Sequence, residues 1–320
     1  MEKKNILFIV GAPKTGTSTL VGMLNRHPNI FIFYETCLNR SKISKYAGKF
    51  LRRYPEARYL FRDEDDIGRS YSRALKFFRE KGYDFKIIGD KFPDINKGLL
   101  NKLRDYGVIF TIRDIRTWLC KDSINDFFFI KDDILYTAID YCIYFLESFL
   151  LPNILHIRMV DMIYQNDKTI EELGRFLNME MSSLDKWWEK VSNINEDNPK
   201  SSLYWWQGHP SSTIKPKNKD IEANLNSHPF WDSLLPIFDK YYQQVNEDFK
   251  DSEIRGDIDK LKALEKFSPL SLKKAYLSYK GYQLFDNKPL TLKRRLKRLF
   301  KRLLKFCFER IYYKINKWLR

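Results

Sequence analysis

The chain alternates short apolar runs with longer stretches in which apolar residues recur at helical spacing. Short runs rich in β-branched and aromatic side chains are typical of strands buried in a parallel sheet. The pattern predicts five such strands, at Ile6–Val10, Ile30–Tyr34, Lys86–Gly89, Val108–Arg113 and Asn153–Ile157.

The stretches between these runs have the periodicity of amphipathic helices. The first predicted helix carries Leu20, Met23 and Leu24 on one side. Strands that alternate with helices predict an α/β fold, in which a central parallel sheet is flanked by helices. The further helices are predicted at Asn96–Tyr106, Trp118–Phe128, Leu135–Leu150, Thr169–Leu177 and Phe230–Phe249.

A candidate anion site lies where the first strand meets the first helix. Gly11 and Gly16 allow the backbone of the loop to approach a ligand closely, and Lys14 adds a full positive charge. The helix start at residues 17–19 adds backbone N–H groups, a positive dipole end and three hydroxyl groups. This combination predicts binding of a phosphate-like group rather than a plain turn.

The spacing of this loop differs from that of nucleoside triphosphatases. Their motif, GxxxxGK[ST], places a lysine directly after the second glycine. Here Gly11 and Gly16 have the required spacing, but Thr17 stands in the lysine position and Lys14 lies within the loop. The dinucleotide motif GxGxxG does not occur at this loop, so a dinucleotide enzyme is also disfavoured.

The order Gly-x-Pro-Lys-Thr-Gly-Thr-Ser resembles the 5′-phosphosulfate loop of sulfotransferases, whose consensus is close to PKxGTT. The resemblance spans roughly residues 5–180 and extends weakly to about 250. It implies a P-loop-like nucleotide-binding fold and the donor 3′-phosphoadenosine-5′-phosphosulfate (PAPS), with no metal required. It assigns the phosphosulfate to Pro13, Lys14, Thr15, Gly16, Thr17, Ser18 and Thr19.

A second part of the resemblance concerns the 3′-phosphate of the donor. Sulfotransferases bind it with an arginine just after a buried strand and a serine about ten residues later. Arg113 and Ser123 match this form and spacing. Arginine is suited to bidentate phosphate contacts. The alternative is that Arg113 pairs with Asp114 or a helix end and that Ser123 is a surface residue.

A third part is the segment Gly89-Asp90-Lys91-Phe92-Pro93, which resembles the Asp-Lys-x-Pro segment of carbohydrate and tyrosyl-protein sulfotransferases. In those enzymes the lysine reaches the transferring group or the acceptor. The segment follows a predicted strand, so we expect it at the carboxyl edge of the sheet, where α/β ligands bind. The alternative is an exposed turn lysine.

An acceptor hydroxyl requires a general base. None of His27, His156, His209 and His228 has the sequence context of the histidine used by cytosolic sulfotransferases. Glycan-type members use a glutamate after the first helix and second strand, which makes Glu35 the candidate base and Asp90 the reserve. The alternative is that Glu35 is an ordinary loop carboxylate. The same resemblance favours a saccharide or glycolipid acceptor, on which Tyr204, Trp205 and Trp206 could stack.

The net charge of +16 is concentrated at the C-terminus. Residues 288–320 contain 13 Lys and Arg residues against one acid, Glu309. Leucine and aromatic side chains recur there near helical spacing, which predicts a basic amphipathic helix over 289–320 lying on an anionic membrane surface. Nucleic acid is the less favoured partner, and packing on the catalytic domain or another protein is the third reading.

These observations divide the chain into a catalytic domain at 1–250, a connector at 251–288 and the helical tail at 289–320. Four scattered cysteines and the lack of an apparent signal peptide predict a cytoplasmic enzyme, peripheral on the inner face of the membrane. The leading hypothesis is a PAPS-dependent sulfotransferase. The alternatives are a P-loop kinase of a small molecule and a non-enzymatic membrane-binding protein.

Overall fold

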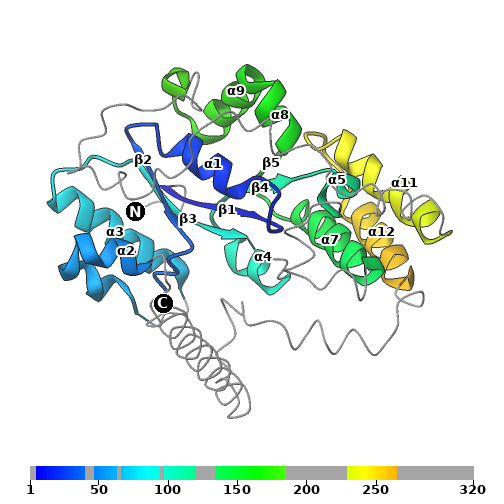
Figure 1. Ribbon diagram of the computed structural model, residues 1–320, viewed down its shortest axis with the longest axis horizontal. Coiled ribbons are helices and arrows are strands. Elements are labelled where there is room, and N and C mark those ends of the chain that lie inside the picture. The colour runs from blue at the N-terminus through cyan, green and yellow to red at the C-terminus, as the bar shows by residue number, and fades with distance from the viewer. Residues whose placement is uncertain are drawn as a thin grey trace, which may run out of the picture. The chain divides into compact units, whose positions relative to one another are not determined.

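The computed structural model describes residues 5–39, 47–62, 66–93, 97–119, 134–184 and 229–264, drawn in colour in Figure 1. All of these residues belong to one compact unit, Met1–Tyr282. The predicted helix over 289–320, Ser123, His209, His228 and the aromatic residues 204–206 lie outside the described residues.

Five parallel strands form the central sheet, in the order β2-β3-β1-β4-β5. The α/β fold with a parallel sheet flanked by helices is therefore confirmed. The strands are β1 (Ile6–Gly11), β2 (Ile30–Tyr34), β3 (Ile87–Pro93), β4 (Gly107–Ile112) and β5 (Ile154–Arg158).

Helices connect the strands and cover both faces of the sheet. They are α1 (Thr17–Leu24), α2 (Ala47–Arg53), α3 (Ile67–Glu80), α4 (Lys97–Leu103), α5 (Ile115–Leu119), α7 (Ile134–Ser148), α8 (Met159–Tyr164), α9 (Asn166–Leu177), α11 (Pro229–Gln243) and α12 (Asp251–Ala263). Short 3₁₀ turns occur at Pro55–Leu60 and Ser182–Leu184.

The two faces of the sheet bury different layers because successive side chains of a strand point in opposite directions. On one face Ile9 and Ile32 join an apolar cluster with Leu20 of α1 and residues of α8 and α9. On the other face Phe8 packs edge-on against Tyr71 of α3, with ring centroids 5.1 Å apart. Figure 1 shows α1 and α9 on one side of the sheet and α3 and α7 on the other.

Strand β3 continues beyond its predicted end. The pattern stops at Gly89 because polar residues follow, but the ladder pairs Lys91 with Ile9 and Phe92 with Val10 of β1. Asp90 and Lys91 are almost fully buried, at 0% and 1% exposure. The segment predicted to follow the strand is thus its last part, and Lys91 is not an exposed turn lysine.

Helix α12 occupies part of the segment predicted as a connector. Its residues Ile254, Ile258 and Leu261 are buried, and the helix packs against α7. Asp257 of α12 also accepts a hydrogen bond from Lys240 of α11 at 2.8 Å. Residues 251–263 therefore belong to the packed body, while residues 265–288 lie outside the described residues.

Candidate active site

The candidate residues gather at one edge of the sheet. The loop after β1, Glu35 after β2, Lys91 near the end of β3 and Arg113 after β4 all follow or end parallel strands. The carboxyl ends of parallel strands meet at the same edge, and ligands bind there where strand order reverses beside the first strand. Residues separated by up to 99 positions in the chain therefore share one location.

The loop between β1 and α1 is shaped by two glycines with positive φ angles. Gly11 has φ 151°, and a Cβ atom there would lie 2.5 Å from the carbonyl oxygen of Thr111. Gly16 has φ 108°, which favours glycine, and a Cβ atom there would crowd Met162 at 3.2 Å. Lys14 has φ 73° and is exposed, so its side chain can contact a ligand bound at the loop.

Two buried side chains, Thr15 and Trp118, form hydrogen bonds that hold this loop. The Thr15 hydroxyl donates to the carbonyl of Ala12 at 2.8 Å and lies 2.8 Å from the Thr111 hydroxyl. The indole N–H of Trp118 in α5 donates to the carbonyl of Pro13 at 2.8 Å. The Thr15 and Trp118 contacts are buried, so Thr15 supports the backbone of the loop.

Helix α1 begins directly after the loop. Its N-cap is Gly16, whose lack of a side chain leaves the helix start without a side-chain cap. The first helical hydrogen bond runs from Leu20 N–H to the Gly16 carbonyl, so the N–H groups of residues 17–19 precede it. Thr17 and Thr19 are buried, whereas Ser18 is half-buried. An anion at this position would meet backbone donors, the helix dipole and Lys14.

Lys91 forms the centre of a buried polar cluster next to α1. Its ammonium group lies 2.8 Å from Glu35 Oε1 and donates to Ser18 Oγ at 2.9 Å. The same nitrogen lies 3.5 Å from the ring centroid of Tyr34, and Tyr34 Oη lies 2.6 Å from Ser18 Oγ. The structure thus brings Ser18, Glu35 and Lys91, all three predicted from the sequence, into one cluster.

Asp90 points to the opposite face of β3 and has a different environment. Its carboxylate accepts hydrogen bonds from the N–H groups of Thr36, Cys37 and Lys91 and from the hydroxyls of Thr36 and Tyr71. Burial raises its pKa, and the hydrogen bonds oppose that rise. A carboxylate held by five groups and fully buried anchors the chain after β2, so the geometry favours Glu35 over Asp90 as a base.

Arg113 is buried at the end of β4, with 3% exposure. Its Nε donates to the Thr117 hydroxyl at 3.1 Å, and Nη1 lies 3.9 Å from the sulfur of Met159. Its backbone N–H and carbonyl both bond to the hydroxyl of Tyr141. The carboxylate of Asp114 is instead bound by Arg116 at 3.0 Å.

Tyr141 and Trp118 connect the arginine to the loop. Their rings stack with centroids 4.1 Å apart, and burial raises the pKa of Tyr141 well above its usual value. Because Trp118 bonds to Pro13 and Tyr141 bonds to Arg113, the two predicted phosphate-binding elements share one rigid support.

The two described histidines have structural environments. His27 lies after α1, where Nδ1 accepts from the Asn29 N–H and Nε2 lies 2.9 Å from the Glu180 carbonyl. His156 lies in β5, 2.7 Å from the Ser148 hydroxyl, and burial lowers its pKa to about 3.

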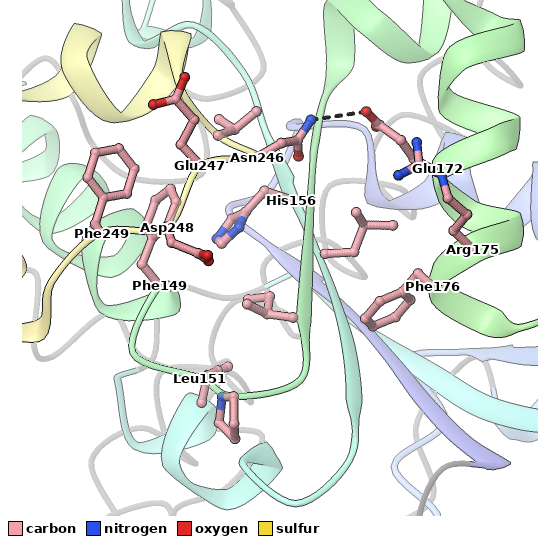
Figure 2. Close-up of a pocket in the computed structure, with 14 residues that line it drawn as sticks. Phe149, Leu151, His156, Glu172, Arg175, Phe176, Asn246, Glu247, Asp248 and Phe249 are labelled. Carbon is pink, nitrogen blue, oxygen red and sulfur yellow. Dashed lines mark hydrogen bonds between the residues drawn. The ribbon is translucent and has the colours of Figure 1, made fainter.

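A separate cavity of about 490 Å³ lies beside the edge strand β5. Figure 2 shows His156 projecting toward its middle, with Glu172 of α9 bonded to Asn246 at 3.1 Å. Its lining includes Leu151 and Pro152, which precede β5, and the first residues of that strand, whereas the candidate site lies where the strands end. The two are therefore different places in the fold.

Sequence reasoning missed the residues that support the site. Tyr34 ends a predicted strand, Trp118 and Tyr141 fall within predicted helices, and Tyr71 lies outside every predicted element, so none of the four has a predicted role. A polar atom on an aromatic residue at a strand end is a usable signal, because buried Tyr and Trp need a hydrogen-bond partner. The partners themselves lie up to 105 residues away in the chain, as between Pro13 and Trp118.

Among the described residues, no group of three or more His, Cys, Asp or Glu side chains is arranged to hold a metal ion. In the same part of the chain, every helix is too short or too polar to cross a membrane.

Comparisons with known proteins give structural neighbours only. No protein-family model matches the chain, and no curated protein matches its sequence. The sulfotransferase domain of the Synechococcus PCC 7002 olefin synthase aligns with a TM-score of 0.47 at 13% identity, over 78% of this chain and 98% of that one.

Two further solved structures are similar to the chain. The sulfotransferase domain of the curacin biosynthetic pathway gives a TM-score of 0.44 at 13% identity, covering 78% of this chain and 100% of that one. Mouse sulfotransferase SULT7A1, complexed with PAP, gives 0.41 at 15% identity, covering 84% and 90%. Since these values are low, the function proposed below rests on the residues of the site.

Proposed function

We propose that the chain is a sulfotransferase that moves a sulfuryl group from PAPS to an acceptor hydroxyl or amine. The observation that carries the proposal is the convergence of Lys14, Lys91 and Arg113 with the start of α1 at one edge of the sheet. Three cationic side chains and a helix N-terminus suit a ligand with several anionic groups. The β1–α1 loop is also the segment whose sequence resembles the phosphosulfate loop.

The donor fits two parts of this edge. The phosphosulfate would lie against the β1–α1 loop, residues 12–16, which we call the donor loop. Gly11 and Gly16 allow the backbone to take this conformation, because a Cβ atom would collide with Thr111 at the first and crowd Met162 at the second. The 3′-phosphate would lie toward Arg113, whose guanidinium is already oriented by Thr117. When bound, PAPS supplies an activated sulfuryl group on a good leaving group.

Catalysis by this chain would consist mainly of positioning and electrostatic stabilisation. Lys14, the exposed cation of the loop, would stabilise the negative charge that develops on the bridging oxygen. Lys91 would stabilise the negative charge on the oxygens of the sulfuryl group during transfer. Ser18 and the first N–H groups of α1 would hold the oxygens of the 5′-phosphate.

Glu35 would accept the proton of the acceptor. Its carboxylate lies at the same edge as the cations, is about 8% exposed and is within 2.8 Å of Lys91. The contact with Lys91 holds the carboxylate of Glu35 in one orientation, as a base requires. Lys91 therefore contacts both the candidate base and Ser18 at the start of α1.

We propose a saccharide or glycolipid as the acceptor, because the Asp90-Lys91-Phe92-Pro93 segment and Glu35 resemble the carbohydrate type. The basic segment 289–320 would hold the enzyme on the anionic inner face of the membrane, beside a lipid-linked acceptor. This placement depends on the sequence pattern alone.

Calorimetric titration tests the donor. We expect tight binding of 3′-phosphoadenosine-5′-phosphate (PAP) and little heat with ATP–Mg²⁺. Strong ATP–Mg²⁺ binding would instead favour the kinase, and binding of neither would favour the non-enzymatic alternative.

The 3′-phosphate contact is tested with Arg113→Ala. This variant should bind PAP about 10- to 100-fold more weakly, the effect of a charge-assisted phosphate contact, and should lose far less affinity for adenosine 5′-phosphate. Equal losses for both nucleotides would remove Arg113 from the 3′-phosphate site.

A further inference from the structure

Tyr34 touches both halves of the candidate site. It is the last residue of β2 and directly precedes Glu35. Its hydroxyl lies 2.6 Å from Ser18 Oγ at the start of α1, and its ring lies 3.5 Å from the Lys91 ammonium group, measured to the ring centroid. At 7% exposure, it is buried between α1 and β3.

The hydroxyl contact has a preferred direction once an anion is present. Lys91 can only donate, so its bond to Ser18 occupies one lone pair of Ser18 Oγ. If Tyr34 donates to the second lone pair, the hydrogen of Ser18 has to point elsewhere. Ser18 is half-buried at the start of α1, so that hydrogen is directed toward a ligand on the loop. A chain of donors running from Tyr34 through Ser18 to an anion is cooperative.

The ring contact acts on Lys91. The Lys91 side chain is 2% exposed, so water does not solvate its charge. Glu35 balances that charge on one side, and the face of the Tyr34 ring lies against the ammonium at a distance typical of a strong cation–π contact. The ring would keep Lys91 in place while Glu35 exchanges its proton with an acceptor.

We propose that Tyr34 is a positioning residue, in which the hydroxyl orients Ser18 toward the donor and the ring holds Lys91 beside Glu35. This inference rests on the proposed function. A core role alone would need only an apolar ring, since the neighbouring side chains Ile9, Ile32 and Leu20 are apolar. The hydroxyl and the ring can therefore be tested separately.

The hydroxyl is tested by a double-mutant cycle on PAP affinity, using the wild type, Tyr34→Phe, Ser18→Ala and the double variant. We expect Tyr34→Phe to weaken PAP by about 3- to 10-fold, the effect of one hydrogen bond. In the Ser18→Ala background, the same change should have no further effect, because Tyr34 acts through Ser18. Tyr106→Phe, which removes a buried hydroxyl bonded to Asp66 and Gly68 of α3, serves as the control and should leave PAP affinity unchanged.

Two results overturn the inference in different ways. If the wild type binds PAP but Tyr34→Phe binds it equally well, or if the two losses multiply, the coupling through Ser18 does not exist. If the wild type does not bind PAP, the proposed function fails and this inference fails with it. The cycle thus separates the two failures, and it requires no knowledge of the acceptor.

The ring is tested by comparing Tyr34→Leu with Tyr34→Phe in turnover. Tyr34→Phe keeps the cation–π contact, so we expect kcat within about 3-fold of the wild type and a raised KM for PAPS. Tyr34→Leu should lower kcat by a further factor of about 10 to 30, because Lys91 loses the ring face. Equal kcat values in the two variants would overturn the role of the ring. A Tyr34→Leu chain that fails to fold would show that the ring is structural and would also overturn it.

Discussion

At the scale of single residues, the site is held in an uncommon backbone conformation. Glu35 and Cys37 have φ angles of 53° and 55°, in the left-handed region that costs a non-glycine residue about 1–2 kcal/mol. Asp90 offsets this cost by accepting the N–H groups of Thr36 and Cys37. The candidate base is thus placed by a neighbouring buried carboxylate, to which the proposed mechanism assigns no chemical step.

Because Glu35 is the candidate base and Asp90 holds the backbone beside it, two conservative substitutions should have different effects. Glu35→Gln should lower turnover by about 100-fold or more, since an amide cannot accept the proton, while PAP affinity stays within a few-fold. Asp90→Asn should lower the free energy of unfolding by about 2–4 kcal/mol, because it places an amide N–H among donors. Turnover on an acceptor found by screening glycolipids and urea unfolding would measure the two effects.

The assignment would be reversed by the opposite pattern. Wild-type turnover in Glu35→Gln, together with a stable but inactive Asp90→Asn, would make Asp90 the base. PAP titration of both variants provides the control for an intact donor loop.

At the scale of elements, α5 is short but supports much of the donor side. It supplies Trp118, which bonds to Pro13, and Arg116, which forms a two-bond ion pair with Asp239 of α11 at 2.9 and 2.7 Å. Through these contacts α5 fixes the loop after β1 and connects it to a helix more than 100 residues later.

We expect Trp118→Phe to loosen the donor loop. The substitution keeps a ring against Tyr141 but removes the donor to Pro13, which leaves a buried carbonyl without this partner. The free energy of unfolding should fall by about 1–3 kcal/mol and PAP should bind several-fold more weakly. Trp231→Phe, the same change at a buried position of α11, is the control for loss of indole packing. Equal effects of the two changes on PAP would contradict a special role for Trp118.

Also at this scale, the sequence predicted the five strands and the helices that correspond to α1, α4, α7, α9 and α11, because hydrophobic periodicity is a local property. The predicted helix Trp118–Phe128 overlaps α5 only at its last two residues, and residues 120–128 lie outside the described part of the chain. It predicted the anion-binding loop after β1 for the same reason, since the seven candidate residues are consecutive in the chain, at 13–19. The end of β3 and the helices α2, α3, α8 and α12 were not predicted. Asp90 and Lys91 look like turn residues until their partners Tyr71 and Glu35 are known, and those partners are brought close only by the fold.

At the scale of the whole molecule, stability should depend on pH through His156. Burial lowers its pKa to about 3 in the folded chain, against about 6.5 when unfolded. Only the unfolded chain takes up this proton between those values, so the stabilising effect is complete above pH 6.5 and is lost as pH falls.

This contribution can be isolated with His156→Gln, whose amide can still donate to Ser148 but does not titrate. Between pH 7 and pH 5, the wild type should lose about 2 kcal/mol more free energy of unfolding than the variant. Urea unfolding at both values measures the difference. Identical losses in the two proteins would show that His156 does not cause the dependence on pH.

The alternation of Asp90 and Lys91 along β3 also has a consequence for misfolding of the chain. These neighbours point to opposite faces, one to α3 and the other to α1. A slip of β3 by one residue against β1 would exchange them, placing an ammonium group in the apolar layer beside Phe8 and a carboxylate beside the donor loop. Misregistered chains would therefore be both unstable and inactive. Mutations that destabilise the fold should then reduce the yield of folded protein, while the activity of each correctly folded molecule stays constant.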